Sequence, residues 1–264
     1  MNPIPAFELA DATFRYPEST ALDSLTLSIT PGQCVAVLGA NGSGKSTLLR
    51  VLAGLCFPER GSVRFFGESL TEPALAHGAF ARNFRRRVGV VFQNPDVQLF
   101  NATVFDEVAF GPLQMGWSKA QILQRVHCAL ADLGIEALKD RPPHRLSGGE
   151  KKRVALASVL VLDPDVLLLD EPTAALDPKS QGQIVDFLFG CVGKKTVITT
   201  THSLEVAQEI ADRVLVLENG RLAATGPTAE ILADTALLER THLLHAHRHR
   251  HSSGAIHSHP HRHH

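Results

Sequence analysis

The sequence contains no apolar run of the roughly 18 residues that a membrane-spanning helix needs. The longest run, VALASVLVL at 154–162, is interrupted by Ser158. The N-terminal stretch MNPIPAFELADATF lacks the basic and then apolar layout of a signal peptide, and the four cysteines are scattered without CxxC spacing. These absences predict that the chain resides in the reducing cytoplasm. Any role at a membrane is expected to be through partner proteins.

An excess of positive charge is also missing. The 26 basic residues are balanced by 27 acidic ones, and the residues from Thr241 onward carry three arginines and no acid, so the rest of the chain is more acidic still. This charge balance argues against nucleic acid as a partner. At 264 residues, with 44% hydrophobic and 20% charged content, the chain has the composition of one large globular domain or two small ones.

Two kinds of strand pattern are present. Four short, nearly continuous apolar runs are typical of parallel strands buried on both faces: CVAVLG, VGVVFQ, VLLLDE and TVITTTH. Three segments alternate imperfectly, as half-exposed antiparallel strands do: FELADATF (7–14), ALDSLTLSI (21–29) and SVRFFG (62–67). We therefore predict an α/β fold with a mostly parallel core sheet and an antiparallel β subdomain.

The region between VVFQ and VLLLD has helical periodicity, at roughly 118–133 and 147–162, and no clear strand. It predicts a helical subdomain inserted at about 96–162. Further on, LENGRL (217–222) has the Asn-Gly of a two-residue hairpin, and 228–239 predicts a last helix with Thr228 as its N-cap. The expected division is a domain of residues 1–240 and a flexible tail of residues 241–264.

GANGSGKST (39–47) fits the phosphate-loop pattern G-x-x-x-x-G-K-[ST] and lies between an apolar strand and a helical stretch. Its glycines let backbone N–H groups turn toward phosphate oxygens, and the following helix N-terminus adds positive potential. We expect Lys45 to reach the β and γ phosphates and Ser46 to ligate Mg²⁺. The predicted nucleotide-binding residues are Gly39, Ala40, Asn41, Gly42, Ser43, Gly44, Lys45, Ser46 and Thr47; the alternative is a simple glycine-rich turn.

Other polar residues follow buried strands and should meet at the carboxyl edge of the same sheet. Asp170 is predicted to hold Mg²⁺, and Glu171 to orient and deprotonate the attacking water. Gln93 is expected to touch Mg²⁺ or that water, and His202 to bond the γ-phosphate. Alternatively, the two acids merely start a solvated loop, and Gln93 and His202 are ordinary turn residues.

A second helix start is built to receive an anion. In RLSGGEKKRVALASVLVL, Ser147 and Glu150 have the spacing of a capping box, while Gly148 and Gly149 leave the first turn unshielded. Two phosphate-facing helix starts about a hundred residues apart are most simply reconciled by a two-fold dimer, in which each chain completes the other's site. The alternative is an ordinary capped helix.

The order and spacing of these motifs resemble those of the ATP-binding-cassette (ABC) ATPases, a family of P-loop NTPases, over roughly residues 7–230. The resemblance implies Walker A at 39–46, a Q-loop at Gln93, the signature at 146–150, Walker B ending at Asp170, a catalytic Glu171, a D-loop Asp177 and a switch His202. It also implies ATP as substrate. Tyr16 is similar to the aromatic residue that stacks on adenine in this family; otherwise it only closes a strand.

VFQNPDVQLF (91–100) together with LSGGEKKRVALA is similar to the energy-coupling-factor importers, although Val97 stands where that group often has a second acid. This likeness implies a peripheral protein on the cytoplasmic face of the cell membrane, partnered by a membrane coupling subunit and a membrane metal-binding subunit. Gln98, Leu99 and Phe100 should approach the coupling subunit, unless they serve packing within the insertion.

The chain closes on HLLHAHRHRHSSGAIHSHPHRHH, which holds ten of its 14 histidines. Imidazole suits Ni²⁺, Co²⁺, Zn²⁺ and Cu²⁺. His245, His247, His249 and His251 share one face if the chain is extended, whereas Gly254 and Pro260 are expected to prevent a regular element. We predict a flexible chelating tail of modest affinity. The alternatives are a purification tag and a merely solvated tail.

Together these features predict an ATPase that powers nickel or cobalt import through an energy-coupling-factor transporter. A vitamin importer's ATPase is the main alternative. A nickel-delivery NTPase would need an Asn-Lys-x-Asp guanine-reading segment, which the sequence lacks. A DNA-repair or chromosome ATPase would need a long coiled coil between Lys45 and Asp170, and no sustained heptads lie there.

Overall fold

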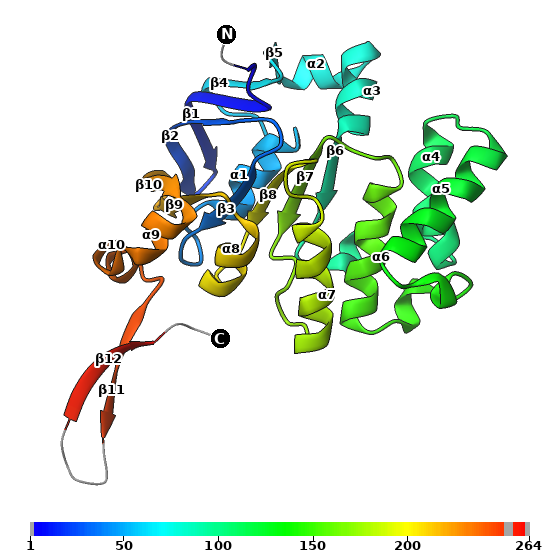
Figure 1. The fold of residues 1–264 in the computed structure, drawn as a ribbon. Coiled ribbons are helices and arrows are strands. Elements are labelled where there is room, and N and C mark those ends of the chain that lie inside the picture. Colours follow the sequence, from blue (N-terminus) through cyan, green and yellow to red (C-terminus); the bar gives the residue numbers. More distant parts are fainter. Residues whose placement is uncertain (1–2, 251–255, 262–264) are drawn as a thin grey trace.

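The computed structural model describes residues 3–250 and 256–261. Its centre is a six-stranded sheet in the order β10-β9-β3-β8-β7-β6, in which every neighbouring pair except β9 with β10 is parallel (Figure 1). The strands are β3 Cys34–Leu38, β6 Val88–Val91, β7 Val166–Asp170, β8 Thr196–Thr200, β9 Arg213–Glu218 and β10 Arg221–Pro227. The mostly parallel core sheet predicted from the four apolar runs is confirmed.

A second, antiparallel sheet has the order β2-β1-β4-β5 and lies beside the first (Figure 1). Its strands are β1 Phe7–Tyr16, β2 Ser19–Ile29, β4 Arg60–Phe65 and β5 Glu68–Ser69. Buried side chains of this sheet pack with α1 (Lys45–Leu52) against one face of the parallel sheet. The predicted antiparallel subdomain is therefore present, and it brings Tyr16 to the side of the sheet where α1 begins.

Three helices stand beside β6 at one end of the parallel sheet: α4 Val104–Gln114, α5 Lys119–Asp132 and α6 Gly148–Leu160 (Figure 1). They pack through a core shared with α7 (Pro178–Phe189) and with the other face of the sheet. The helical stretches expected at 118–133 and 147–162 are confirmed as α5 and α6. Two further helices, α2 Glu72–Ala76 and α3 Gly78–Arg87, were not predicted, since they are short and meet at Gly78 with φ +98°.

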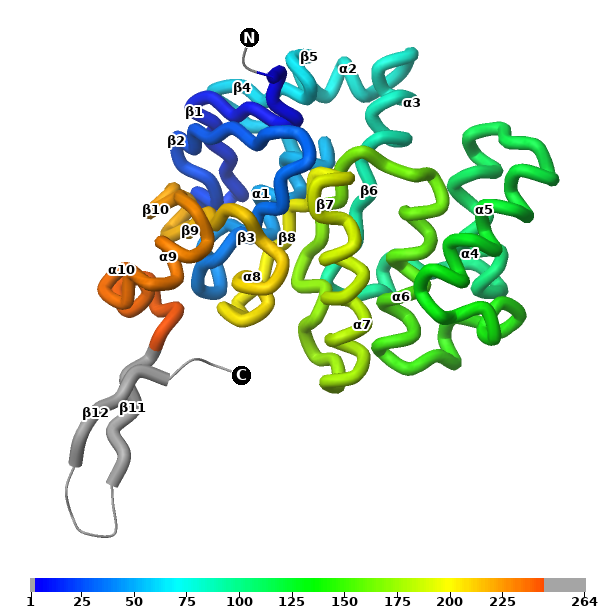
Figure 2. Tube along the Cα trace, viewed as in Figure 1, coloured from blue at the N-terminus to red at the C-terminus, as the bar shows by residue number. Residues whose placement is uncertain are grey.

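The C-terminal part of the body differs from expectation in one respect. After α8 (Leu204–Ile210) and the β9–β10 hairpin, the expected single helix is two, α9 Thr228–Ala233 and α10 Thr235–Arg240, beside β9 and β10 (Figure 2). Asp234 breaks it, because its carboxylate accepts the N–H of Leu237 and caps a new helix. Thr228 is not a cap: its hydroxyl donates to the Ala211 carbonyl at 2.6 Å.

The tail is also more regular than predicted. β11 (His245–Arg250) and β12 (Ile256–His261) form an antiparallel pair in which His245 faces His261 in register. The expectation that Pro260 prevents a regular element is wrong, because a two-stranded ribbon has only edge strands, where proline is tolerated. His251 lies outside the described residues. No helix among the described residues is long and apolar enough to span a membrane.

Candidate active site

The loop between β3 and α1 is shaped by glycines in conformations that other residues rarely adopt. Gly39, Gly42 and Gly44 have φ angles of +154°, +82° and +107°. A Cβ on Gly44 would lie 2.5 Å from the Ala21 carbonyl oxygen, so the loop packs directly on β2. Ser43 carries a buried hydroxyl with no hydrogen-bond partner among the described residues. The loop is thus a tight backbone cradle at the N-terminus of α1, which suits an anion.

Lys45 is buried, and its ammonium bends back over the loop. Nζ donates to the carbonyls of Gly39 at 2.8 Å and Ala40 at 3.1 Å. Burial lowers the pKa of Lys45, while the carboxylates of Glu171 and Asp170 oppose that shift. A cation whose hydrogen bonds go to two neutral carbonyls over an anion cradle is well placed to exchange them for phosphate oxygens.

A cavity of about 350 Å³ opens in front of this loop. Tyr16 lines it, and the tyrosine hydroxyl accepts from the Arg50 guanidinium at 3.1 Å. Gln93 and Glu171 line it as well. The cavity also has a contribution from β2, which sequence reasoning missed; its lining is Tyr16, Ser19, Thr20, Ala21, Asn41, Gly42, Gly44, Lys45, Ser46, Thr47, Gln93 and Glu171. An aromatic ring, a phosphate cradle and one acid in one cavity fit a nucleoside triphosphate.

Asp170 and Ser46 meet where β7 ends, next to α1. Ser46 Oγ donates to Asp170 Oδ1 at 3.1 Å, and Thr200 Oγ1 donates to the same oxygen at 2.6 Å. The three side chains offer hard oxygen donors, the chemistry that Mg²⁺ prefers. The donor set fits the predicted metal site, and Thr200 is a member that sequence reasoning missed, although it stands in the quoted TVITTTH.

Glu171 follows in an unusual backbone conformation, with φ +48°. Its backbone N–H donates to the hydroxyl of Thr200 at 3.0 Å, and its carboxylate lies 3.0 Å from His202 Nδ1. The carboxylate is mostly buried whereas the imidazole is mostly exposed. Lys152, in α6, donates its ammonium to the Glu171 carbonyl at 2.9 Å. Such local strain is held where surrounding contacts over-determine it, which is common at catalytic positions.

Two sets of residues are predicted to contact one nucleotide, those around the phosphate loop and those at the helix start of Ser147. The chain brings only the first set together. Residues of the 39–47 loop, Tyr16, Gln93 and Glu171 share one cavity, and Glu171 holds His202. Ser147, Gly148 and Gly149 are not among the described residues that line it. The structure therefore leaves the signature helix start apart from the cavity of its own chain.

The predicted capping box at that helix start is confirmed. Ser147 Oγ accepts the N–H of Glu150 at 3.3 Å, and the Glu150 carboxylate accepts the N–H of Ser147 at 2.8 Å. This backbone hydrogen bond is the main reason that the pKa of Glu150 is lowered. A Cβ on Gly148 would meet nothing, but one on Gly149 would lie 2.5 Å from the Ser180 hydroxyl. The expectation of two unshielded glycines therefore holds for Gly148 only, because Gly149 is packed against α7.

The segment after Gln93 is anchored to α6. Gln98 accepts the N–H of Phe92 at 3.4 Å and donates to the Ala155 carbonyl at 3.3 Å, while Leu99 packs on the core of the insertion. Phe100 remains at the surface, 68% exposed, and stacks edge-on with Phe110 at 5.0 Å. Of the three residues expected to approach a membrane subunit, Gln98 and Leu99 thus have packing roles and Phe100 is the one available at the surface.

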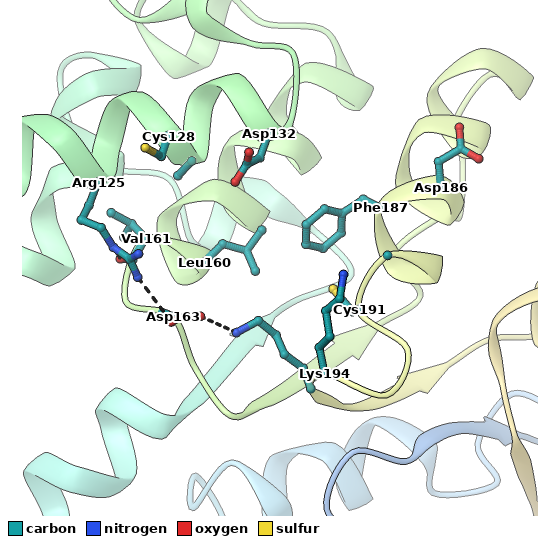
Figure 3. A pocket seen from close by; sticks show the side chains of 13 residues that line it. Arg125, Cys128, Asp132, Leu160, Val161, Asp163, Asp186, Phe187, Cys191 and Lys194 are labelled. Carbon is teal, nitrogen blue, oxygen red and sulfur yellow. Dashed lines mark hydrogen bonds and ion pairs between the residues drawn. The ribbon is translucent and has the colours of Figure 1, made fainter.

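A separate cavity of about 440 Å³ lies at the amino edge of the sheet, between α5 and the end of α7 (Figure 3). Asp163, just before β7, pairs there with Lys195 at 2.6 Å and Arg125 at 3.6 Å. The Lys195 hydrogen bond is the main cause of a lowered pKa at Asp163. Because these charges compensate one another, the cavity offers no strong attraction for a charged ligand, and it is remote in the fold from the phosphate loop.

Comparison with known proteins places this geometry in a family. A family model described as ABC transporter matches residues 22–174. The nickel import ATP-binding protein NikO of Rhodobacter capsulatus is 57% identical over 244 residues, which cover 91% of this chain and 96% of that protein. ATP-binding proteins of energy-coupling factor transporters are also among the relatives, in agreement with the resemblance seen in the sequence.

Solved structures agree. The structure of cbiO1 from Clostridium perfringens, part of the ABC transporter complex cbiONQ, matches with a TM-score of 0.77 and 36% identity, covering 90% of this chain and 95% of that one. A dimeric ATP-binding cassette in a post-hydrolysis state with ADP and Pi matches with a TM-score of 0.74 and 28% identity, covering 84% and 98%. The predicted P-loop NTPase fold is confirmed, and the chain belongs to the ABC transporter family as one of its ATP-hydrolysing subunits.

Proposed function

We propose that this chain powers the import of nickel or cobalt through an energy-coupling-factor type ABC transporter, on the cytoplasmic face of the cell membrane. The observation that carries the motor part is the meeting of the phosphate loop, the Ser46–Asp170 pair and the Glu171–His202 pair at one sheet edge. The similarity to a nickel import ATPase supports the cargo.

In this proposal Glu171 is the general base. Its carboxylate is positioned by Thr200 and Lys152 through the backbone and by His202 through the side chain. It can accept the proton of a water that attacks the γ-phosphate, a role worth about 10²- to 10⁴-fold in rate. Lys45 neutralises charge on the β and γ phosphates, and His202 bonds the γ-phosphate. Mg²⁺ held near Ser46, Asp170 and Gln93 would add charge neutralisation at the phosphates.

The proposed working unit is a homodimer. Ser147, Gly148 and Gly149 do not line the cavity of their own chain, yet their helix start has an open Gly148 suited to an anion. A second copy of the chain would bring this helix start over the nucleotide. The similar ATP-binding cassette that is dimeric with ADP and Pi supports this arrangement. Asp177 lies in the loop that follows Glu171. Its carboxylate accepts the Ser180 N–H at 3.0 Å and so caps α7.

Glu171→Gln tests both parts at once. With the base removed, we expect hydrolysis to fall by about 10²- to 10⁴-fold while ATP binding persists, so that light scattering detects an ATP-dependent dimer. Lys45→Ala is the matched control, because it should lose nucleotide binding and with it the dimer. Normal turnover by Glu171→Gln would show that another group is the base, and a strictly monomeric ATP-loaded form would overturn the dimer.

The proposed membrane contact is the apolar surface of the insertion. Val97 is 70% exposed, Phe100 68%, Leu113 58% and Phe110 38%. Exposed large apolar side chains on one subdomain, two of which, Phe100 and Phe110, stack on each other, support a protein-binding surface. We propose that this surface meets the membrane coupling subunit, and that the membrane metal-binding subunit completes the importer.

The proposed role of the tail is to bind the incoming metal through its histidines, among them His245, His247, His249 and His251. A truncated protein for testing this should end at Leu244 rather than at Arg240, since Thr241, Leu243 and Leu244 are buried. We expect Ni²⁺ or Co²⁺ to bind the full chain with several equivalents more than the truncated one, as measured by titration calorimetry. Equal binding would remove the tail from the mechanism.

The cargo is tested by uptake of radiolabelled Ni²⁺ and Co²⁺ into cells with and without this protein. We expect uptake of one of these metals to depend on the protein and to be lost with Glu171→Gln. Vitamin uptake that depends on the protein, with metal uptake unchanged, would favour the vitamin-importer alternative instead.

A further inference from the structure

Another cavity, distinct from the one between α5 and α7 and also of about 440 Å³, adjoins the nucleotide cavity at Glu171. Asn41, Gln93 and Glu171 line both cavities, so the two are neighbours. The remaining lining combines loop residues and His202 with two residues from the far end of the chain, His242 and Leu243. The start of the C-terminal tail therefore borders the space where the proposed base and the proposed γ-phosphate ligand stand.

The tail start is fixed there by its local structure. Helix α10 ends in a pair of bonds typical of a Schellman motif: His242 N–H donates to the Glu239 carbonyl at 3.1 Å and Leu243 N–H to the Leu238 carbonyl at 2.8 Å. Thr241 is buried and its hydroxyl donates to the Leu237 carbonyl at 2.8 Å. Leu243 and Leu244 belong to the core that also contains α8 and α9. His242 is thus held beside the site by buried neighbours on both sides.

His242 occupies the position of this motif that normally belongs to glycine. Its φ of +58° is left-handed, a conformation that costs a residue with a side chain roughly 1–2 kcal/mol. Glycine would remove that cost and keep the motif. His242 combines a left-handed backbone with a place in the lining of a cavity shared by Glu171 and His202, which points to a role for its side chain.

We propose that His242 is a ligand through which transition metal carried by the histidine tail enters this cavity and slows ATP hydrolysis. The inference rests on the proposed function, because the metal is its cargo. His242 is the first histidine of the tail, and Leu244 is the last core residue before β11, which begins at His245. An imidazole at the root and further imidazoles along the tail can complete one coordination sphere for Ni²⁺ or Co²⁺.

The expected sign is inhibition. The metal and the tail chain would occupy the cavity that His202 and His242 both line, and in the proposed dimer they would obstruct closure of a second copy over the nucleotide. Metal that accumulates on the cytoplasmic side would therefore slow its own import.

The test measures ATP hydrolysis by the full chain at saturating Mg-ATP while Ni²⁺ is titrated. We expect the rate to fall about fivefold or more once the tail is loaded. Each variant is compared through its own ratio of rates with and without Ni²⁺: His242→Gly, His242→Asn, and the chain ending at Leu244. All three should lose most of the inhibition. Thermal melting should find His242→Gly at least as stable as wild type, since glycine relieves the left-handed backbone.

Two results would overturn the inference. Equal Ni²⁺ inhibition of wild type and His242→Gly would show that the metal acts elsewhere, for example by displacing Mg²⁺ from ATP. Undiminished hydrolysis by a wild-type chain whose tail is loaded with Ni²⁺ by calorimetry would show that the tail does not act on the site. Either result leaves metal import untouched, whereas the absence of metal uptake dependent on this protein would remove the proposed function itself.

Discussion

Lys152 provides the sharpest test of how the site is held. It lies in the second turn of α6, is 6% exposed, and donates its ammonium to the carbonyls of Glu171 at 2.9 Å and Ala174 at 2.8 Å. Burial lowers its pKa, and the Glu171 and Asp170 carboxylates oppose that shift. The side chain therefore fixes the backbone of the strained loop that carries the proposed base, and Lys152→Met removes that link while it keeps the side-chain length.

The expected cost follows from the two bonds. A hydrogen bond to a charged group contributes about 1.5–3 kcal/mol. The partly buried Ala174 carbonyl would lose its ammonium donor, whereas the Glu171 carbonyl would keep the N–H of Ala174 at 3.2 Å. The substitution also releases the penalty of burying an ammonium, which offsets part of the loss. We expect the free energy of unfolding to fall by about 2–4 kcal/mol. A shift of the Glu171 backbone worth about 1.4 kcal/mol in the transition state would lower kcat tenfold.

Lys151→Met is the matched control. Lys151, the neighbour in sequence, bonds the exposed Asp96 carboxylate at 2.7 Å at the surface, so its loss should cost no more than about 1 kcal/mol. Denaturant unfolding and steady-state hydrolysis are measured for both variants. If Lys152→Met unfolds at the same denaturant concentration as Lys151→Met and keeps its kcat, the ammonium does not hold the loop and the reasoning fails.

Three further predictions concern single sites. Gly44→Ala should weaken ATP binding by tenfold or more in equilibrium dialysis, because its Cβ would lie 2.5 Å from a carbonyl of β2 at a φ of +107°; wild-type affinity would contradict the cradle. Burial raises the pKa of Cys34 to about 12, so at about pH 8 a thiol reagent should modify the exposed Cys128 long before Cys34; equal rates would contradict that burial. The Lys195 hydrogen bond lowers the pKa of Asp163, so its contribution is present above about pH 4 and is lost as pH falls through the folded pKa. Asp163→Asn should therefore cost about 0.5–1 kcal/mol near pH 7 and little in acid, given the exposed carboxylate; an acid-independent difference would refute the assignment.

The phosphate loop could be predicted from the sequence because its chemistry is local. Consecutive residues supply the positive φ angles, the cation and the helix start, and the observed φ values of Gly39, Gly42 and Gly44 match that need. The buried strands could be predicted equally well, since a parallel strand covered on both faces is apolar throughout. Asp170 and Glu171 then follow from the rule that ligands bind at the carboxyl ends of such strands.

Other members of the site depend on contacts that no local pattern carries. A lysine in the second turn of a capped helix is ordinarily a solvated residue, and only the packing of α6 on the loop after β7 turns Lys152 into a buried donor. Thr200 stands among other threonines in an apolar strand, and only its distance of 2.6 Å to the Asp170 carboxylate distinguishes it. These residues act through partners far away along the chain.

In the C-terminal region, tertiary contacts override a local signal and thereby set where the tail begins. Thr228 fits an N-cap by sequence, but its hydroxyl bonds the Ala211 carbonyl instead and ties α9 to the chain before β9. Asp234 then starts α10. After that helix Thr241 is buried, and Leu243 lies in the core and lines a cavity together with residues of the phosphate loop. The nearness of the first tail histidine to Glu171 is thus a product of these long-range contacts. A metal-binding tail is predicted from the sequence alone, whereas the position of its first histidine in a cavity shared with Glu171 follows only from the fold.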